Sequence, residues 1–299
     1  MDMRPLVSVL VVTWNRREEL AKSLESVVAQ TYPNYELVVV DNASTDGSAD
    51  LVRERFPRAF LIRSHKNIGC PSGRNLGFAN CRGKYVYMLD DDGWLELDAL
   101  ERAVERGESD DALGVIMTQI KEVDGDRVVR SRPLGLTQPL YVSSFTGCCS
   151  MIRRDVFERI GGFPDDFFRQ GEEEDFAIRM LDIGKFCFFE PAAVMYHRPS
   201  VINRNVTKFI YYTLRNTQKT GLRYWPFPYN IMRVAWIYLY ALRFVVTRGQ
   251  VLWPAKLMGN LIRDLLTLRG RRKPVRLSTF RLYRRLQKCP SPTCPGDAQ

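Results

Sequence analysis

The chain has 299 residues, of which 45% are hydrophobic, and it carries a formal net charge of +10. This length supports one domain of about 200 residues with a buried core, together with a helical appendage. The seven cysteines lack the spacing of a disulfide framework, which argues against a stapled secreted fold and favours a reducing cytoplasm. An apolar strand begins within a few residues of Met1, so no secretory leader is expected.

The first 90 residues alternate apolar, strand-like runs with helical stretches. Strands are expected over residues 7–13, 36–40, 60–63 and 84–89, and helices over about 17–30 and 47–55, the second capped by Asp46 or Thr45. This alternation is typical of a βαβ sheet, in which polar groups gather at the carboxyl ends of the strands. We therefore expect an α/β fold whose polar segments share one edge of the sheet.

Three consecutive carboxylates, Asp90, Asp91 and Asp92, follow the fourth of these strands. Such a cluster repels itself unless a cation lies on it. Oxygen ligands at a strand end suit Mg²⁺ or Mn²⁺, which keep open positions for substrate phosphates. An isolated run of aspartates is otherwise an ordinary acidic turn. The polar segments after the other strands favour a metal site for a diphosphate.

The section from about residue 113 to 152 is expected to add further strands. Beyond it, four acids at 172–175 precede an amphipathic helical stretch. The helix dipole stabilises acids in a first turn, which accounts for one or two of the four. His197 follows another strand-like run, where a lone histidine is more often structural than a ligand.

Composition changes sharply after about residue 200. Residues 200–299 hold 19 Lys or Arg and 2 acids, whereas the preceding part carries a net negative charge. The apolar stretch between Arg233 and Arg243 has nine residues, well short of the roughly 20 that span a bilayer. Basic helices with interleaved aromatics fit an anionic membrane surface. The alternative is a helical extension packed on the first domain, and no nucleic-acid module is recognisable.

Together, these segments resemble the family 2 glycosyltransferases, inverting enzymes of GT-A fold that use nucleotide-diphosphate sugars. The resemblance covers roughly residues 6–200 and rests on segments at 7–16, 38–48, 67–77, 88–94, 161–163 and 171–176, with His197 after them. It implies a Rossmann-like α/β fold, with a mixed, mainly parallel sheet flanked by helices and a basic helical C-terminal extension. We expect a catalytic domain over 1–200, a basic, aromatic-rich amphipathic region over 201–287 and a disordered tail over 288–299.

The resemblance also assigns the residues that bind the nucleotide-diphosphate sugar. They are Thr13, Asn15, Asp41, Asn67, Gly69, Arg74, Asp90 and Asp91. The first three would line the nucleoside pocket, unless Asp41 only forms an Asx turn. Asn67, Gly69 and Arg74 would lie over the pyrophosphate, because glycine allows close backbone approach and a guanidinium donates to phosphate oxygens. Arg74 could otherwise be a helix-surface arginine, and Asp91 would face the donor sugar.

The remaining implied roles concern the metal and the proton. Asp92 would bind Mn²⁺ or Mg²⁺ directly, with Asp90 and His197 as further ligands. Inversion needs a base that takes the proton from the acceptor hydroxyl. In the family pattern this base is Glu173, with Glu172 and Asp175 as alternatives. Many relatives carry Asp at this position, so the longer Glu side chain is a departure. Thr146 and Gly147 would face the donor sugar and the acceptor.

We therefore expect a cytoplasmic enzyme on the inner face of a membrane. It would move a sugar from a UDP- or dTDP-sugar to a hydroxyl of a lipid-linked or cell-envelope glycan. Its partners would be this donor, a glycan or glycolipid acceptor and an anionic membrane surface, without nucleic acid. One alternative is a catalytically silent nucleotide-sugar-binding or membrane-scaffold protein. Another is a sugar-phosphate nucleotidyltransferase, which normally needs a glycine-rich basic loop where residues 14–17 stand.

Overall fold

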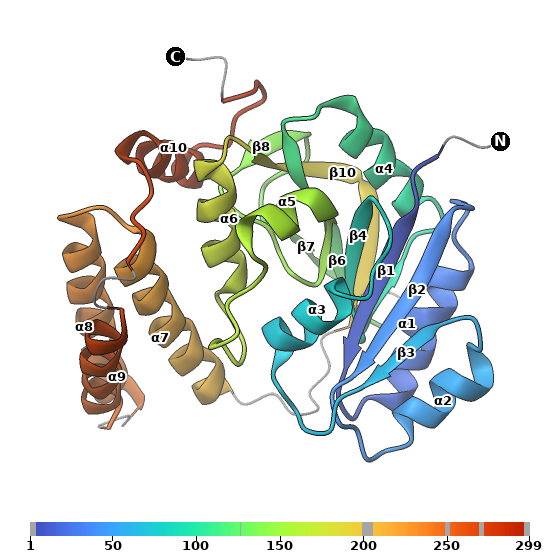
Figure 1. The fold of residues 1–299 in the computed structure, drawn as a ribbon, viewed down its shortest axis with the longest axis horizontal. Coiled ribbons are helices and arrows are strands. Elements are labelled where there is room, and N and C mark those ends of the chain that lie inside the picture. The colour runs from blue at the N-terminus through green and yellow to red at the C-terminus, as the bar shows by residue number, and fades with distance from the viewer. Residues whose placement is uncertain (1–3, 126, 199–205, 249–251, 269–271, 296–299) are drawn as a thin grey trace.

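The fold is taken from a computed structural model that describes residues 4–125, 127–198, 206–248, 252–268 and 272–295 (Figure 1). Ten strands form one sheet: β1 Val7–Thr13, β2 Tyr35–Asp41, β3 Phe60–Arg63, β4 Tyr85–Asp90, β5 Gly93–Leu95, β6 Leu113–Asp124, β7 Arg127–Arg132, β8 Leu140–Val142, β9 Cys149–Arg153 and β10 Phe186–His197. The helices are α1 Arg17–Val28, α2 Ser48–Arg55, α3 Cys70–Phe78, α4 Ala99–Ser109, α5 Arg154–Ile160, α6 Glu172–Asp182, α7 Val206–Tyr224, α8 Tyr229–Arg248, α9 Trp253–Thr267 and α10 Leu277–Lys288.

The sheet is mixed, with strand order β3-β2-β1-β4-β9-β6-β10-β5, while β7 pairs with β6 and β8 with β10. β1 runs parallel to β2 and β4, and β3 runs parallel to β2. The register aligns Thr13 with Asp41 and Val12 with Asp90. The carboxyl ends of these strands therefore meet at one edge of the sheet, as expected of a βαβ arrangement.

Both faces of the sheet are covered, which explains why its central strands read as continuous apolar runs. Val9 and Val11 of β1 face one core layer, which also contains side chains of α1 and α4. Leu10 faces the opposite layer, where Phe78 of α3 and Phe176 of α6 pack. This alternation follows from the two-residue period of a strand. The sheet is therefore a rigid platform for the loops at its edge.

The C-terminal helices pack beside this platform (Figure 1). Ion pairs join α7 and α8 to the first part of the chain: Arg223 lies 2.6 Å from Asp166, and Arg233 lies 3.1 Å from Glu174. A small core that includes Leu214 and Ile237 holds α7, α8 and α9 together. This arrangement matches the alternative of a packed extension. Among the described residues, no helix is long and apolar enough to cross a membrane.

The end of the chain differs from the expected disordered tail. Tyr141 of β8 and Ser291 exchange backbone hydrogen bonds, with N–O distances of 2.7 Å and 3.0 Å. The unpaired edge of a short strand can form backbone hydrogen bonds with another segment. The proline-rich sequence after residue 288 did not suggest such pairing. Ser291 of the expected tail therefore pairs with β8, and residues 296–299 lie outside the described residues.

Candidate functional site

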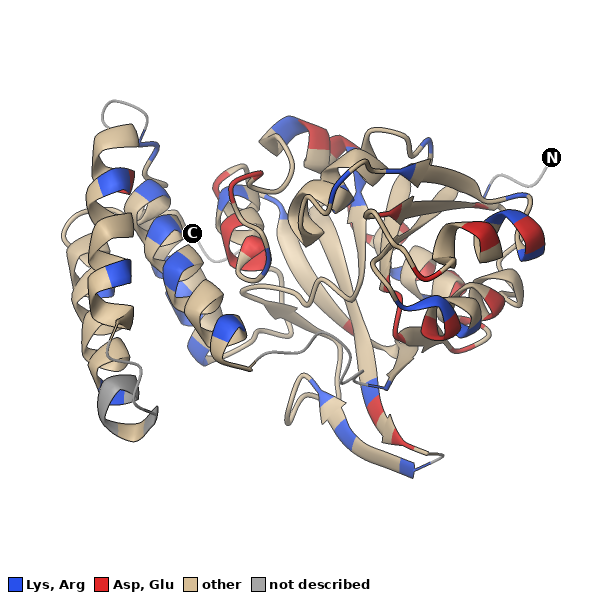
Figure 2. Cartoon of the chain, turned by 90° about the horizontal axis from the view of Figure 1, so that it is seen from below, with Lys and Arg blue, Asp and Glu red and all other residues tan. Residues whose placement is uncertain are grey.

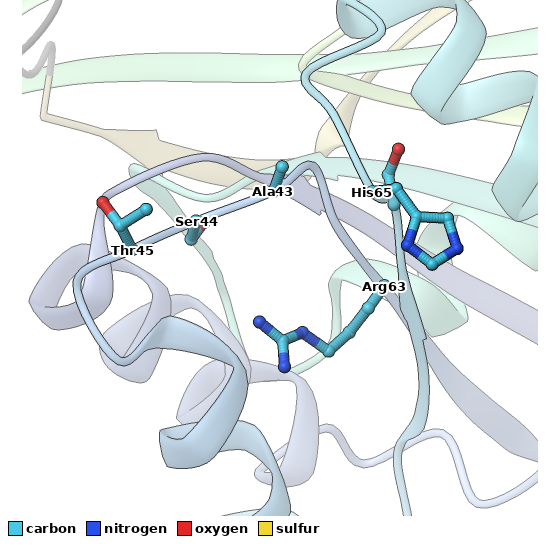
Figure 3. Close-up of a pocket in the computed structure, with 6 residues that line it drawn as sticks. Ala43, Ser44, Thr45, Arg63 and His65 are labelled. Atoms are coloured by element: carbon cyan, nitrogen blue, oxygen red, sulfur yellow. The ribbon is translucent and has the colours of Figure 1, made fainter.

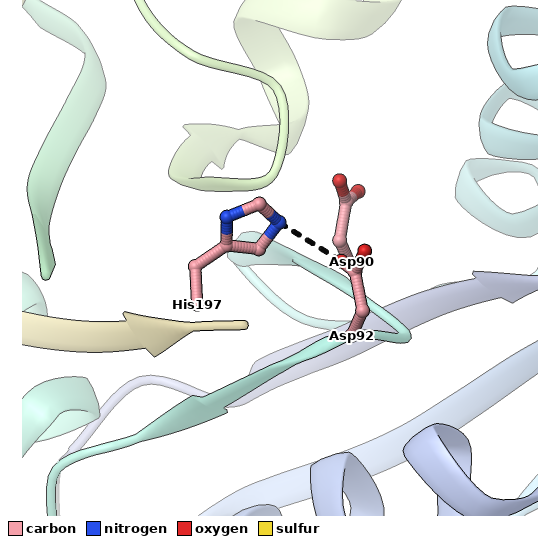
Figure 4. Close-up of side chains that lie close together, drawn as sticks. All are labelled: Asp90, Asp92 and His197. Carbon is pink, nitrogen blue, oxygen red and sulfur yellow. Dashed lines mark hydrogen bonds and ion pairs between the residues drawn. The ribbon is translucent and has the colours of Figure 1, made fainter. Parts of the chain in front are cut away.

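A cluster of two carboxylates and an imidazole lies where β4 ends (Figure 4). One ligand atom from each of Asp90, Asp92 and His197 lies within 4.8 Å of the other two. The Nε2 of His197 is 3.0 Å from Oδ1 of Asp92. Strand pairing explains the cluster, since β10 pairs with β5 in antiparallel register and places His197 opposite Gly93. The expected metal ligands are thus brought together, and their oxygen and nitrogen atoms suit a divalent cation.

Arg16, to which no role was assigned from the sequence, lies against the same acidic run. Its NH1 donates to Oδ1 of Asp91 at 2.7 Å and to Oδ2 of Asp92 at 3.0 Å. The hydroxyl of Thr13 donates to the other oxygen of Asp91 at 2.9 Å. Burial raises the pKa of Asp91 to about 7, with Arg16 opposing the rise. Asp91 is thus held by two side chains at the end of β1, and its expected place facing the donor sugar stays a prediction.

A surface hollow of about 390 Å³ lies beside the ends of β2 and β3 (Figure 3). It is lined by Ala43, Ser44, Thr45, Arg63, Ser64 and His65. Asp41 is fully buried next to it, with Oδ1 accepting from the Ser44 N–H at 2.9 Å. Its other oxygen lies 3.3 Å from Nε of Arg63. Asp41 therefore fixes the loop that lines the hollow. Residues 43–45 of the lining belong to the segment 38–48 on which the resemblance rests, whereas residues 63–65 were not predicted to line a site.

Asn15 joins this wall to the end of β1. It has a positive φ of 52°, and its Oδ1 accepts from the Thr45 N–H at 2.7 Å. Asparagine tolerates the left-handed region better than most residues. The structure thus places Thr13, Asn15 and Asp41 around the same strand ends. Asp46 accepts from the Ser48 N–H at 3.0 Å, but the residue at the N-cap position of α2 is Gly47, so neither Asp46 nor Thr45 is the expected N-cap.

The loop before α3 is shaped by its own side chains and by a glycine. Oδ1 of Asn67 accepts from the Gly69 N–H at 3.0 Å and from Nδ2 of Asn42 at 3.1 Å. Gly69 has a φ of 86°, and a Cβ there would lie 2.3 Å from the carbonyl oxygen of Phe168. No side chain fits in that space, because the obstacle is backbone. Gly69 thus allows the loop before α3 to lie against residue 168.

We expect Gly69→Ala to lower the free energy of unfolding by about 3 kcal/mol, because it adds a clash to backbone strain. Gly161→Ala is the matched control: φ there is 83°, with nothing within 4 Å of an added Cβ. It should cost only about 1 kcal/mol. Urea unfolding followed by circular dichroism gives both values. Equal losses would show that the contact with Phe168 does not matter.

Arg74 of α3 is buried between two acids. Its NH1 lies 2.9 Å from Oε1 of Glu172, and its NH2 lies 3.2 Å from Oδ1 of Asp90. Burial and the neighbouring Glu173 raise the pKa of Glu172, while Arg74 opposes the rise. A helix-surface role for Arg74 is excluded, since its side chain is 6% exposed. For the expected contact, a pyrophosphate oxygen must reach the guanidinium of Arg74 beside its ion pairs with Glu172 and Asp90.

The three acids expected as a base differ in their surroundings. Glu172 is 3% exposed and paired with Arg74, whereas Asp175 is fully buried and accepts from Nε of Arg179 at 2.8 Å. Glu173 is partly exposed, and its Oε1 accepts from the Gly147 N–H at 3.1 Å. A Cβ at Gly147 would lie 2.6 Å from that oxygen. The geometry therefore favours Glu173 as the acid within reach of a substrate.

The sequence model of one protein family, described as glycosyl transferase family 2, matches residues 8–161. The chain belongs to this family. This family 2 member is 29% identical over 216 residues to the succinoglycan biosynthesis protein ExoO of Rhizobium meliloti, across 66% of this chain and 62% of that protein. The matched part spans 14% of one curated relative, 42% of a second and 71% of a third.

Two solved structures show the same fold. The mannosyltransferase PcManGT from Pyrobaculum calidifontis, in complex with GDP-Man and Mn²⁺, matches with a TM-score of 0.62 and 21% identity over 96% of this chain and 84% of that one. The S. aureus protein TarS 1-349, in complex with UDP, matches with a TM-score of 0.59 and 18% identity over 82% and 74%. The family and the GT-A fold expected from the motifs are confirmed.

Proposed function

We propose that this family 2 member transfers a sugar from a nucleotide-diphosphate sugar to a hydroxyl of a lipid-linked or cell-envelope glycan, with inversion. One observation carries the proposal. Asp90 belongs to the cluster with Asp92 and His197 and also pairs with Arg74, whose other partner, Glu172, directly precedes Glu173 in α6. A site for a leaving diphosphate and an acid within reach of the acceptor therefore share one edge of the sheet.

Asp90, Asp92 and His197 would hold Mn²⁺ or Mg²⁺. The donor set fits, because two carboxylates and an imidazole converge there and two of these side chains are buried. A divalent cation supplies stabilisation of the negative charge that develops on a leaving diphosphate. The PcManGT structure contains Mn²⁺ and GDP-Man, which supports a metal-assisted reaction of the same class.

The remaining steps concern side chains of this chain. Glu173 accepts the proton of the acceptor hydroxyl, whose oxygen forms a bond to the anomeric carbon as the bond to the diphosphate oxygen breaks. The backbone N–H of Gly147 holds one carboxylate oxygen of Glu173, and the other is available to the proton. The hollow beside β2 and β3 would take the nucleoside, with Arg63 in its wall and Asp41 paired with Arg63.

The function is tested by measuring nucleotide release from UDP-, dTDP- and GDP-sugars in Mn²⁺ buffer, with membrane lipid extract as the acceptor source. The proposal predicts release from one donor, dependent on acceptor and abolished by a chelator. If no donor is consumed and calorimetry shows no nucleotide binding, the proposal is wrong. The catalytically silent alternative would then account for the fold.

The outer helices carry the features of a surface that lies on a membrane. Trp236 and Leu239 of α8 are 51% and 68% exposed, and Leu266 of α9 is 71% exposed. Lys256 and Arg263 are exposed on α9, and the C-terminal helices show far more blue than red in Figure 2. Aromatic and apolar side chains among basic residues suit an anionic leaflet. We infer peripheral binding of α8 and α9 to the inner face of a membrane.

The double variant Trp236→Ser and Leu239→Ser should weaken binding to vesicles that contain phosphatidylglycerol by about tenfold or more, since burying a large apolar side chain is worth about 2 kcal/mol. Sedimentation of the vesicles measures the bound fraction. Phe60→Ser is the control, because Phe60 on β3 is 55% exposed and lies on the first part of the chain. Equal binding by the wild type, the double variant and Phe60→Ser would contradict the inference.

A further inference from the structure

The α5–α6 loop, residues 161–171, leads directly into the helix that carries the acids. Its last two residues have left-handed backbone, with φ of 68° at Gln170 and 86° at Gly171. α6 begins at the next residue, so Glu173 is only two positions beyond this turn. A non-glycine residue with positive φ persists only where its surroundings hold it there. The contacts of this loop therefore decide where Glu173 points.

One side of the loop is attached to α3. Asn75 donates to the Phe163 carbonyl and accepts from the Phe163 N–H, both at 2.9 Å. The Cys70 N–H donates to the Phe168 carbonyl at 3.0 Å. These bonds fix the loop up to residue 168. The turn at Gln170 and Gly171 is held by another element.

That element is α7, which lies outside the segment matched by the family. Asn216 is fully buried, and its Nδ2 donates to the carbonyl oxygens of Arg169 at 2.8 Å and Gln170 at 2.7 Å. A Cβ at Gly171 would lie 3.2 Å from the Cβ of Asn216, so this side chain also packs against the turn. Arg223, also on α7, pairs with Asp166 of the same loop at 2.6 Å.

We propose that Asn216 is a positioning residue for the reaction and acts through the turn that begins α6. Its amide donates to the carbonyl oxygens of the two residues before Gly171, and it thereby fixes the first turn of the helix and the place of Glu173. The proposal rests on the proposed function for the role of Glu173. A displacement of about 1 Å in a reacting group can cost about a hundredfold in rate. The C-terminal helices are thus part of the catalytic unit.

Three variants test the proposal on the full chain. Asn216→Asp keeps the size of the side chain but replaces the donating NH2 group with a carboxylate oxygen, which only accepts. Asn216→Ala removes the whole amide group. Asn260→Ala is the control, because Asn260 is a buried asparagine of α9 that donates to the hydroxyl of Tyr211 at 2.7 Å. The readouts are kcat and KM for the donor sugar, and amide hydrogen exchange over residues 168–175 by mass spectrometry.

Both Asn216 variants should lower kcat about tenfold to a hundredfold with the donor KM within about threefold. Their amides over 168–175 should exchange about tenfold faster, whereas Asn260→Ala should leave both readouts as in the wild type. Unchanged exchange in Asn216→Asp would overturn the proposal. Faster exchange with unchanged kcat would also overturn it, because the turn would then not position Glu173. A wild type that consumes no donor sugar refutes the proposed function instead, and the exchange data still decide whether Asn216 holds the turn.

Discussion

Glu173→Gln should lower kcat about a thousandfold while the donor KM stays within about threefold, since general-base catalysis contributes about 10²–10⁴ in rate. The amide of Gln cannot take the proton of the acceptor hydroxyl, yet it keeps an oxygen that can accept from the Gly147 N–H. That bond, 3.1 Å long in the wild type, preserves the position of the side chain. Steady-state kinetics with the donor found in the panel measures both constants.

Glu174→Gln is the matched control for this prediction. Glu174 is the next residue of α6, but it pairs with Arg233 of α8 at 3.1 Å. Burial raises the pKa of Glu174, and Arg233 opposes the rise. The control should therefore affect stability and leave kcat within about threefold, because its partner lies outside the site. If Glu173→Gln kept wild-type turnover, or if both variants lost activity equally, Glu173 would not be the base.

Asp92→Asn should lower metal-dependent turnover by about a hundredfold or more. Metal coordination is worth several kcal/mol of transition-state stabilisation, and about 1.4 kcal/mol corresponds to tenfold in rate. Asp92 is 5% exposed, and its oxygens face His197 at 3.0 Å and Arg16 at 3.0 Å. The neutral amide keeps the shape of the side chain but offers no carboxylate to a cation.

Binding of Mn²⁺ in the presence of UDP or GDP, measured by calorimetry, gives a second readout that does not depend on turnover. It should weaken at least tenfold in Asp92→Asn. Asp98→Asn is the control, since Asp98 lies at the start of α4 and pairs with Arg102 at 3.1 Å. Wild-type Mn²⁺ affinity in Asp92→Asn would show that the metal binds elsewhere.

The sequence predicted well what depends on local pattern. The ends of β1, β2 and β4 were placed within about one residue, because apolar runs and the polar residues after them are visible along the chain. Parallel pairing then brought Thr13, Asp41 and Asp90 to one edge. The assigned roles in binding and catalysis stay predictions.

The sequence could not show how the acidic groups are neutralised. The run at Asp90–Asp92 was expected to need a metal, yet Arg16 and Arg74 already supply two cations to it. Their contacts join residues 16 and 74 to residues near 90, and no periodicity encodes such pairs. The buried Arg74 and the partly buried Arg16 explain how a self-repelling cluster folds and holds its shape.

The resemblance placed His197 with Asp92, but the pairing of β10 with β5 that brings them together was not visible in the sequence. The pairing of Ser291 with Tyr141, across 150 residues of chain, was not predicted. α7 holds the α5–α6 loop through the buried Asn216 and through the ion pair of Arg223 with Asp166. Composition identified the basic C-terminal region, but only the fold shows that it contacts the loop before the acids.

The anomeric configuration of the transferred sugar tests the central claim most directly. Nuclear magnetic resonance of the product, formed by the wild-type chain from the donor that the panel identifies, gives this configuration. Single displacement with Glu173 as base predicts that it is inverted relative to the donor. A product that retains the donor's configuration would contradict the account, because a single attack from the opposite face cannot give it.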